Sequence, residues 1–167
     1  MPTDSFPKEF PGVTPVLVTD DSPTAIKFYE EAFDAKVLGG ARESNGKWWY
    51  CELFINGGRM MVQDVHPDDM PFKAPTAEPP AKLGGTASLV HIYVNDVDAS
   101  YRRAIEAGAK SLQEPTDLFW GDRNAGIIDP AGHRWIISTR VKNVDLEWLT
   151  RVTNEAVAET EKARSSK

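Results

Sequence analysis

The first part of the chain alternates between the two-residue period of a strand and the three-to-four-residue period of a helix. Residues 12–19 are rich in β-branched side chains, which predicts a strand. From Ala25 to Phe33, apolar side chains recur every three or four positions, which predicts a helix capped by Asp21 or Ser22. Three strand-like stretches follow, joined by turns with Asn-Gly pairs that are typical of antiparallel hairpins: residues 35–41, 47–55 and 59–65.

The same order of elements then repeats. Between residues 66 and 86 the pattern stops, and five of the twelve prolines lie there, which indicates a linker or a long loop. Residues 88–95 predict another strand, and residues 98–107 predict another helix. Further on, Arg-Trp-Ile at 134–136 matches Arg-Met-Met at 59–61 at an offset of 75, and each triplet follows a glycine turn. This repeat predicts two βαβββ modules.

The predicted fold class is therefore α+β, with one module at residues 11–65, the linker at 66–86, and a second module at 87–140. A helical tail is expected at residues 141–167. Its thin apolar stripe is formed by Leu146, Leu149, Val152 and Val157, which suits an accessory helix.

Length and charge exclude several classes of protein. A chain of 167 residues allows one ordinary domain or two small modules that share a core. With 25 acidic and 19 basic residues the net charge is −6, which disfavours nucleic acid and anionic membranes as partners. No apolar run is long enough to span a membrane, and the polar, Pro-containing start is unlike a secretory signal, so we expect a soluble cytoplasmic protein. Cys51 is the sole cysteine, which excludes an internal disulfide.

Two sequence elements, together with the repeat, resemble the vicinal oxygen chelate superfamily of glyoxalase I, extradiol dioxygenases and bleomycin-resistance proteins. They are AIKFYEEAFDAKV in the first module and WGDRNAGIIDPAGHRW in the second, which contains D-P-x-G-H-R-W at residues 129–135. The resemblance covers about residues 11–144 and is greatest to the PhnB-like branch. It implies that the two mixed sheets curl into halves of a funnel around a cleft, where the enzymes of the family hold a divalent metal with His and Glu side chains.

In the metal-dependent relatives, the ligands lie on the first and last strand of each module. The matching positions here are Val13 or Thr14, Met61, Leu89 and Ile136. None of them offers an imidazole or a carboxylate, so the resemblance implies that the shared metal site and its metal cofactor are absent. One alternative stays open, because His91 faces the same side of its strand as Leu89 and could form a displaced metal site with Glu52.

Aromatic and polar side chains of the first module are candidate ligand contacts. Strand alternation places Trp48, Tyr50 and Glu52 on one face, where they could stack a flat or cationic ligand beside a carboxylate. The same aromatic residues could equally fill a core. Gln63, at the end of the last strand, could supply a polar contact or simply be solvated.

The second module adds two kinds of candidate. Trp120 and Arg123 lie in a Phe-Trp-Gly-Asp-Arg segment that suits a cavity mouth, although Asp122 and Arg123 could instead brace the last hairpin. His91 could be an acid, a base or a hydrogen-bond donor in a cavity, or a satisfied core residue. The two other histidines are expected to play structural or solvated roles: His133 orders its turn, and His66 opens the linker in contact with water.

The sequence supports two main hypotheses about function. The first is a metal-free protein that binds a small aromatic or cationic molecule in a cleft between the modules, as the resemblance to bleomycin-resistance proteins implies. Its ligand contacts would be Trp48, Tyr50, Glu52, Gln63, His91, Trp120 and Arg123. The second is a metal-dependent lyase, isomerase or dioxygenase at His91 and Glu52. A third hypothesis is that the protein has lost its ligand and is now a structural or interaction module. No catalytic residue is assigned, and aromatic rims on large sheets suggest a homodimer.

Overall fold

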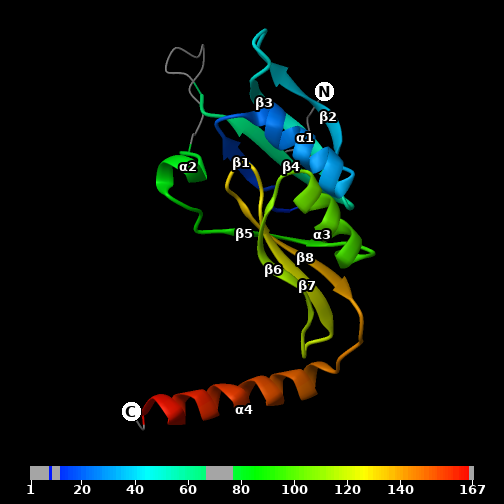
Figure 1. Ribbon diagram of the computed structural model, residues 1–167, viewed down its shortest axis with the longest axis vertical. Coiled ribbons are helices and arrows are strands. Elements are labelled where there is room, and N and C mark those ends of the chain that lie inside the picture. Colours follow the sequence, from blue (N-terminus) through cyan, green and yellow to red (C-terminus); the bar gives the residue numbers. More distant parts are fainter. Residues whose placement is uncertain (1–7, 9–11, 67–76, 166–167) are drawn as a thin grey trace.

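The computed structural model describes Lys8, residues 12–66 and residues 77–165 (Figure 1). The first module consists of β1 (Val16–Thr19), α1 (Ser22–Phe33), β2 (Lys36–Arg42), β3 (Trp48–Ile55) and β4 (Gly58–Asp64). The second consists of β5 (Leu89–Tyr93), α3 (Val97–Glu106), β6 (Lys110–Asp117), β7 (Asp122–Ile128) and β8 (Arg134–Arg140). The short helix α2 (Pro80–Leu83) precedes the second module, and α4 (Leu146–Ser165) follows it.

Each module forms a four-stranded mixed sheet with the same topology. The strand orders are β1-β4-β3-β2 and β5-β8-β7-β6. The first and last strands of each module pair in parallel, and the other pairs are antiparallel. Val16 lies opposite Met61 in one sheet, as His91 lies opposite Ile136 in the other. The predicted α+β fold with two βαβββ modules is confirmed.

Local sequence accounts for the ends of these elements. α1 begins where the Asp21 carboxylate accepts a hydrogen bond from the Thr24 amide at 3.2 Å, and it ends at Asp34 in the left-handed conformation. Asn56 and Gly57 connect β3 to β4 with φ angles of 49° and 85°. Two consecutive positive φ angles are what a two-residue hairpin with the right twist requires, and the Asn-Gly pair supplies them.

Some predicted boundaries differ from the observed ones. β1 begins at Val16 rather than at residue 12, because Pro15 has no amide hydrogen and contributes only its carbonyl, which accepts from the Met61 amide at 2.9 Å. The predicted linker falls partly on residues 67–76, and the predicted start of the first module on residue 11, which lie outside the described residues. The described end of that linker contains α2, which the sequence did not predict.

The two helices α1 and α3 lie side by side and cover the same side of the two sheets (Figure 1). One core runs across both modules. The ring of Trp135 in β8 lies 5.3 Å from Tyr29 and 5.0 Å from Phe33, both in α1. Each sheet therefore has one face that packs against helices and one face that is turned away from them, which we call its open face.

The C-terminal helix α4 extends away from both modules (Figure 1). None of its 20 residues is buried. The apolar stripe predicted from the sequence lies on this helix and is not covered by the two modules. Its first residue, Leu146, has a side chain that is 73% exposed. Among the described residues, no helix is both long and apolar enough to cross a membrane.

Candidate functional site

The D-P-x-G-H-R-W element connects the two modules. The buried carboxylate of Asp129 accepts hydrogen bonds from the Tyr29 hydroxyl at 2.6 Å, from the Trp135 indole at 2.9 Å and from the His133 amide at 2.9 Å. Burial, followed by the nearby Asp129, raises the pKa of Tyr29 well above its usual value, so its hydroxyl stays protonated and donates. Nε2 of His133 lies 2.9 Å from the carbonyl oxygen of Val18, so His133 orders its own turn and also holds β1.

A matching contact joins the modules from the other side. The Asn56 side chain, in the β3–β4 turn, donates to the backbone carbonyl of Tyr93 in β5. Each module thus reaches from its last hairpin turn to the first strand of the other module. Because both sheets carry their helices on the same side, their open faces form one surface, which we call the open platform. It includes Tyr50, Glu52, Phe54, Arg59, Met61, His91, Tyr93, Asp122, Ile136, Ser138 and Arg140.

The first-module half of the platform exposes aromatic rings around an ion pair. Tyr50 and Phe54 of β3 are 42% and 39% exposed, whereas the intervening Cys51 and Leu53 are buried toward the helix. Glu52 shares the face of Tyr50, as alternation predicted, and also that of Phe54. Its carboxylate lies 3.0 Å from Nη1 of Arg59 on β4, and both side chains are about one-quarter exposed.

The second-module half of the platform carries a network of paired polar side chains. Nε2 of His91 lies 2.7 Å from Oγ of Ser138, and the His91 ring lies 4.9 Å from the ring of Tyr93. The Tyr93 hydroxyl donates to the buried Asp122 carboxylate at 2.8 Å, and Nε of Arg140 lies 2.5 Å from the other carboxylate oxygen. The hydrogen bond with Tyr93, then that with Asp122, raises the pKa of Arg140. Tyr93 itself is 47% exposed, so a ligand could reach its ring.

Trp48 does not share the open face with Tyr50. The register between β2 and β3 shifts between Ala41, opposite Tyr50, and Arg42, opposite Trp48. A bulge of this kind breaks the two-residue alternation on which the sequence prediction rested. Trp48 packs against the buried core with the Arg42 guanidinium 5.6 Å above its ring, and its amide donates to the buried Asp64 at 2.9 Å.

Two polar side chains near the end of the first module are less exposed than the sequence suggested. Gln63 is 9% exposed, so this strand-end side chain is buried rather than solvated. His66 is half-buried, and its Nε2 lies 2.9 Å from the backbone carbonyl of Trp49, so the expectation of a solvated histidine was wrong.

Arg123 and Trp120 lie away from the open platform. Arg123 faces α3, where its guanidinium holds Asp98 at 2.7 Å and Asp117 at 2.8 Å, and this contact lowers the pKa of Asp98. Asp122 and Arg123 are neighbours on a strand and so point to opposite sides. Each braces β7 against an adjacent strand, Asp122 through Arg140 on β8 and Arg123 through Asp117 on β6. Trp120 packs on Phe119 at the tip of the β6–β7 hairpin, where Gly121 (φ 92°) passes so close to Lys142 that no Cβ would fit.

The seven predicted ligand contacts therefore do not gather in one pocket of a single chain. The β2–β3 and β6–β7 hairpins lie at opposite ends of the two modules, which separates Trp48 from Trp120 (Figure 1). Tyr50, Glu52 and His91 do lie on the platform.

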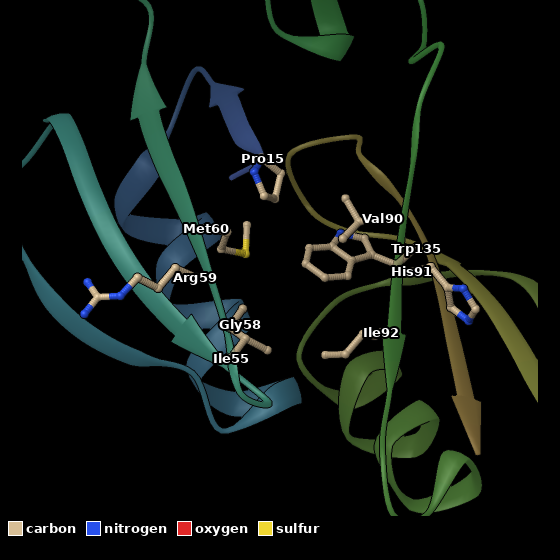
Figure 2. Close-up of a pocket in the computed structure, with 9 residues that line it drawn as sticks. All are labelled: Pro15, Ile55, Gly58, Arg59, Met60, Val90, His91, Ile92 and Trp135. Carbon is tan, nitrogen blue, oxygen red and sulfur yellow. The ribbon is translucent and has the colours of Figure 1, made fainter. Parts of the chain in front are cut away.

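A hollow of about 130 Å³ lies at the seam between the modules (Figure 2). Apolar side chains from both sheets point into it: Pro15, Ile55, Met60, Val90, Ile92 and Trp135. Arg59 and His91 stand at its edges with their side chains turned away from it (Figure 2). This hollow therefore lies behind the platform, and the Glu52–Arg59 and His91–Ser138 pairs lie on its two sides.

The residues present do not fit the family's divalent metal. Met61 and Ile136 occupy equivalent positions in the two sheets, and neither side chain offers oxygen or nitrogen. The alternative ligands are engaged elsewhere, Glu52 with Arg59 and His91 with Ser138. Within residues 12–66 and 77–165, no three His, Cys, Asp or Glu side chains cluster in a way that could hold a metal ion.

The sequence did not predict the side-chain network that links Tyr93, Asp122 and Arg140. Part of it was accessible, because alternation places Tyr93 on the same face of its strand as His91. The remainder depends on which strands pair, since Asp122 reaches Tyr93 across β8.

Comparisons with known proteins agree with this architecture. Residues 13–137 match a sequence model of the Glyoxalase/Bleomycin resistance protein/Dioxygenase superfamily. An uncharacterized protein of Mycobacterium tuberculosis (strain H37Rv) is 40% identical over 137 residues, which is 82% of this chain and 79% of that protein.

Solved structures are similar as well. The structure of TioX from Micromonospora sp. ML1 has 27% identity and a TM-score of 0.58, covering 77% of this chain and 99% of that chain. A glyoxalase/bleomycin resistance protein/dioxygenase from Nocardioides has 19% identity and a TM-score of 0.56, covering 86% of this chain and 90% of that chain. At that identity the second similarity concerns the fold alone.

Proposed function

The chain belongs to the glyoxalase/bleomycin resistance protein/dioxygenase superfamily, and from that premise we propose that it binds a small aromatic molecule on the open platform without a metal ion. The observation that carries this proposal is the exposure of three aromatic rings on the platform: Tyr50 at 42%, Phe54 at 39% and Tyr93 at 47%. Exposed aromatic side chains gathered on one face are characteristic of binding surfaces.

The polar groups of the platform would orient such a ligand. Glu52 and Arg59 form a partly exposed pair, which a cationic group could open by pairing with the carboxylate. On the other side of the seam, His91 and Tyr93 offer an imidazole and an aromatic ring fixed by Ser138 and Asp122. A neutral or cationic aromatic molecule fits both halves.

The second candidate is a metal-dependent lyase, isomerase or dioxygenase that uses His91 and Glu52. Its support is that both side chains flank the seam. It requires a third donor and the loss of the contacts that Arg59 and Ser138 make with these residues, so it is the weaker proposal. We also assign the chain to the PhnB-like branch of the superfamily, on the two sequence elements quoted above.

We further propose that the protein is a homodimer. α4 presents its apolar stripe without burying any residue, and an isolated helix of this length is marginal in water unless that stripe packs against something. A second copy would supply both a surface for α4 and an additional set of aromatic side chains.

A thermal-shift screen of neutral, cationic and anionic aromatic compounds tests the proposed function. A compound that binds only the folded protein raises its melting temperature, and the rise grows with compound concentration. We expect the largest rises from neutral or cationic aromatic compounds, unchanged by EDTA. The proposal would be contradicted if no compound raised the melting temperature in a concentration-dependent way. It would also be contradicted if the rises in melting temperature vanished with EDTA and returned with a divalent metal.

A further inference from the structure

The hollow at the seam is lined by side chains that the platform does not use. Ile55 and Met60 belong to the helix-facing side of the first sheet, and Val90, Ile92 and Trp135 belong to the same side of the second. Four of these five residues are buried, with exposures of 1% to 8%. The two sheets thus leave a space between the start of β4 in the first module and β5 in the second (Figure 2).

We propose that this hollow is a second binding site, separate from the platform, for a small uncharged apolar molecule the size of one aromatic ring. Its volume is about 130 Å³. An engineered apolar cavity of about 150 Å³ stays dry and binds benzene, so the size is sufficient for a single ring.

The lining selects for apolar groups and against charge. The side chains that point into the hollow are hydrocarbons, the Met60 thioether and the Trp135 indole (Figure 2). The Trp135 N–H is already donated to Asp129 at 2.9 Å, so it offers no hydrogen bond to an occupant. A charged occupant would find no polar partner among these side chains, which is unfavourable.

The two polar residues at the edge do not change this conclusion. Arg59 turns toward Glu52 at 3.0 Å, and His91 turns toward Ser138 at 2.7 Å. An apolar ring is favoured by contact with the Met60 sulfur and the face of Trp135. Because the occupant touches both modules, its binding stabilises their association.

The site can be tested with benzene itself as the probe. In a titration followed by methyl NMR, we expect the Met60, Val90 and Ile92 methyl resonances to shift in a saturable manner, while the Met61 methyl, on the platform, shifts little. Val90→Phe should fill the hollow and weaken benzene binding at least tenfold. Leu89→Phe is the matched control, because it adds a ring at a 57% exposed neighbour on the opposite face of the same strand.

Met60→Phe, with Met61→Phe as its control, repeats the experiment from the other module if Val90→Phe does not fold. The proposal predicts loss of benzene binding in Met60→Phe and retention in Met61→Phe. Unshifted Val90 and Ile92 methyls up to the solubility of benzene would overturn it, as would equal affinity in the filled and control variants. Tyr50→Ala, which alters only the platform, should leave benzene binding unchanged, so failure of this site is distinguishable from failure of the platform.

Discussion

The helix-covered side of the sheets and the open platform use polar residues in opposite ways. On the helix-covered side, Asp129 and Asp64 are buried, and each accepts three hydrogen bonds. On the platform, Glu52 and Arg140 remain partly exposed and pair with one or two neighbours. The carboxylates of Asp129 and Asp64 are buried and out of reach of a ligand, whereas the carboxylate of Glu52 is partly exposed beside aromatic rings.

This difference indicates that the sequence element typical of the family stabilises the fold, whereas other residues are the ones proposed to bind a ligand. D-P-x-G-H-R-W is the most specific sequence element, and its Asp129 and His133 hold the two modules together rather than contact solvent. The residues proposed to bind a ligand lie outside that element, on strands where aromatic exposure is visible only in the structure. Conspicuous motifs can therefore mark the scaffold of a site instead of the site.

The largest expected effect comes from removing the carboxylate at the module joint. Asp129→Ala leaves the buried Tyr29, Trp135 and His133 donors unpaired. We expect a loss of about 3 kcal/mol or more in the free energy of unfolding, measured by denaturant titration. Asp20→Ala, at an exposed turn residue, is the control. Equal losses in the two variants would contradict the role of Asp129 at the module joint.

A smaller loss of stability is expected when the side-chain network on the platform is disrupted. Arg140→Ala leaves Asp122 with the Tyr93 hydroxyl as its remaining partner, but Arg140 is 49% exposed, so water can replace part of the contact. We expect about 1–2 kcal/mol in the free energy of unfolding, reduced further at high salt. A cost as large as that of Asp129→Ala would mean that the platform network also carries the fold.

The buried thiol gives a pH dependence on the helix-covered side. Burial, followed by Glu30 and Glu52, raises the pKa of Cys51 to about 11 from its ordinary value of 9.0. The thiol is neutral when protonated, so its contribution to stability is complete below pH 9 and is lost as the pH rises toward 11.

Unfolding at pH 8 and pH 10.5 should therefore show a decline that Cys51→Ala reduces. Tyr29 also contributes to the decline, since its pKa is raised, and the cysteine variant isolates the thiol part. Native Cys51 should resist alkylation by iodoacetamide at neutral pH. Rapid alkylation of the folded protein would show that the residue is accessible.

The smallest change in stability is expected from deletion of α4. A chain ending at residue 145 loses α4, none of whose residues 146–165 is buried, so its melting temperature should stay within a few degrees of the full chain at low concentration. Sedimentation should show a dimer for the full chain and a monomer for the shortened one. A full chain that is monomeric at micromolar concentrations would contradict the proposed pairing.

Much of the fold follows from the sequence, whereas the site follows only in part. Periodicity and Asn-Gly turns located the strands and helices, because each is a local property of the chain. The position of Trp48 was missed since a bulge between β2 and β3 interrupts the alternation. The Tyr29–Asp129 contact joins residues that lie 100 positions apart in two different modules. No local sequence pattern shows that these two residues come together.

The central claim is that the open platform binds an aromatic ligand through its exposed rings. Calorimetric titration of the most strongly stabilising compound into Tyr50→Ala tests it most directly, with Trp148→Ala as the control because Trp148 is 39% exposed on α4, away from the platform. We predict that Tyr50→Ala weakens binding by about 1–3 kcal/mol at an unchanged melting temperature, while Trp148→Ala binds as the unmodified protein does. Unaltered affinity in Tyr50→Ala would contradict the claim.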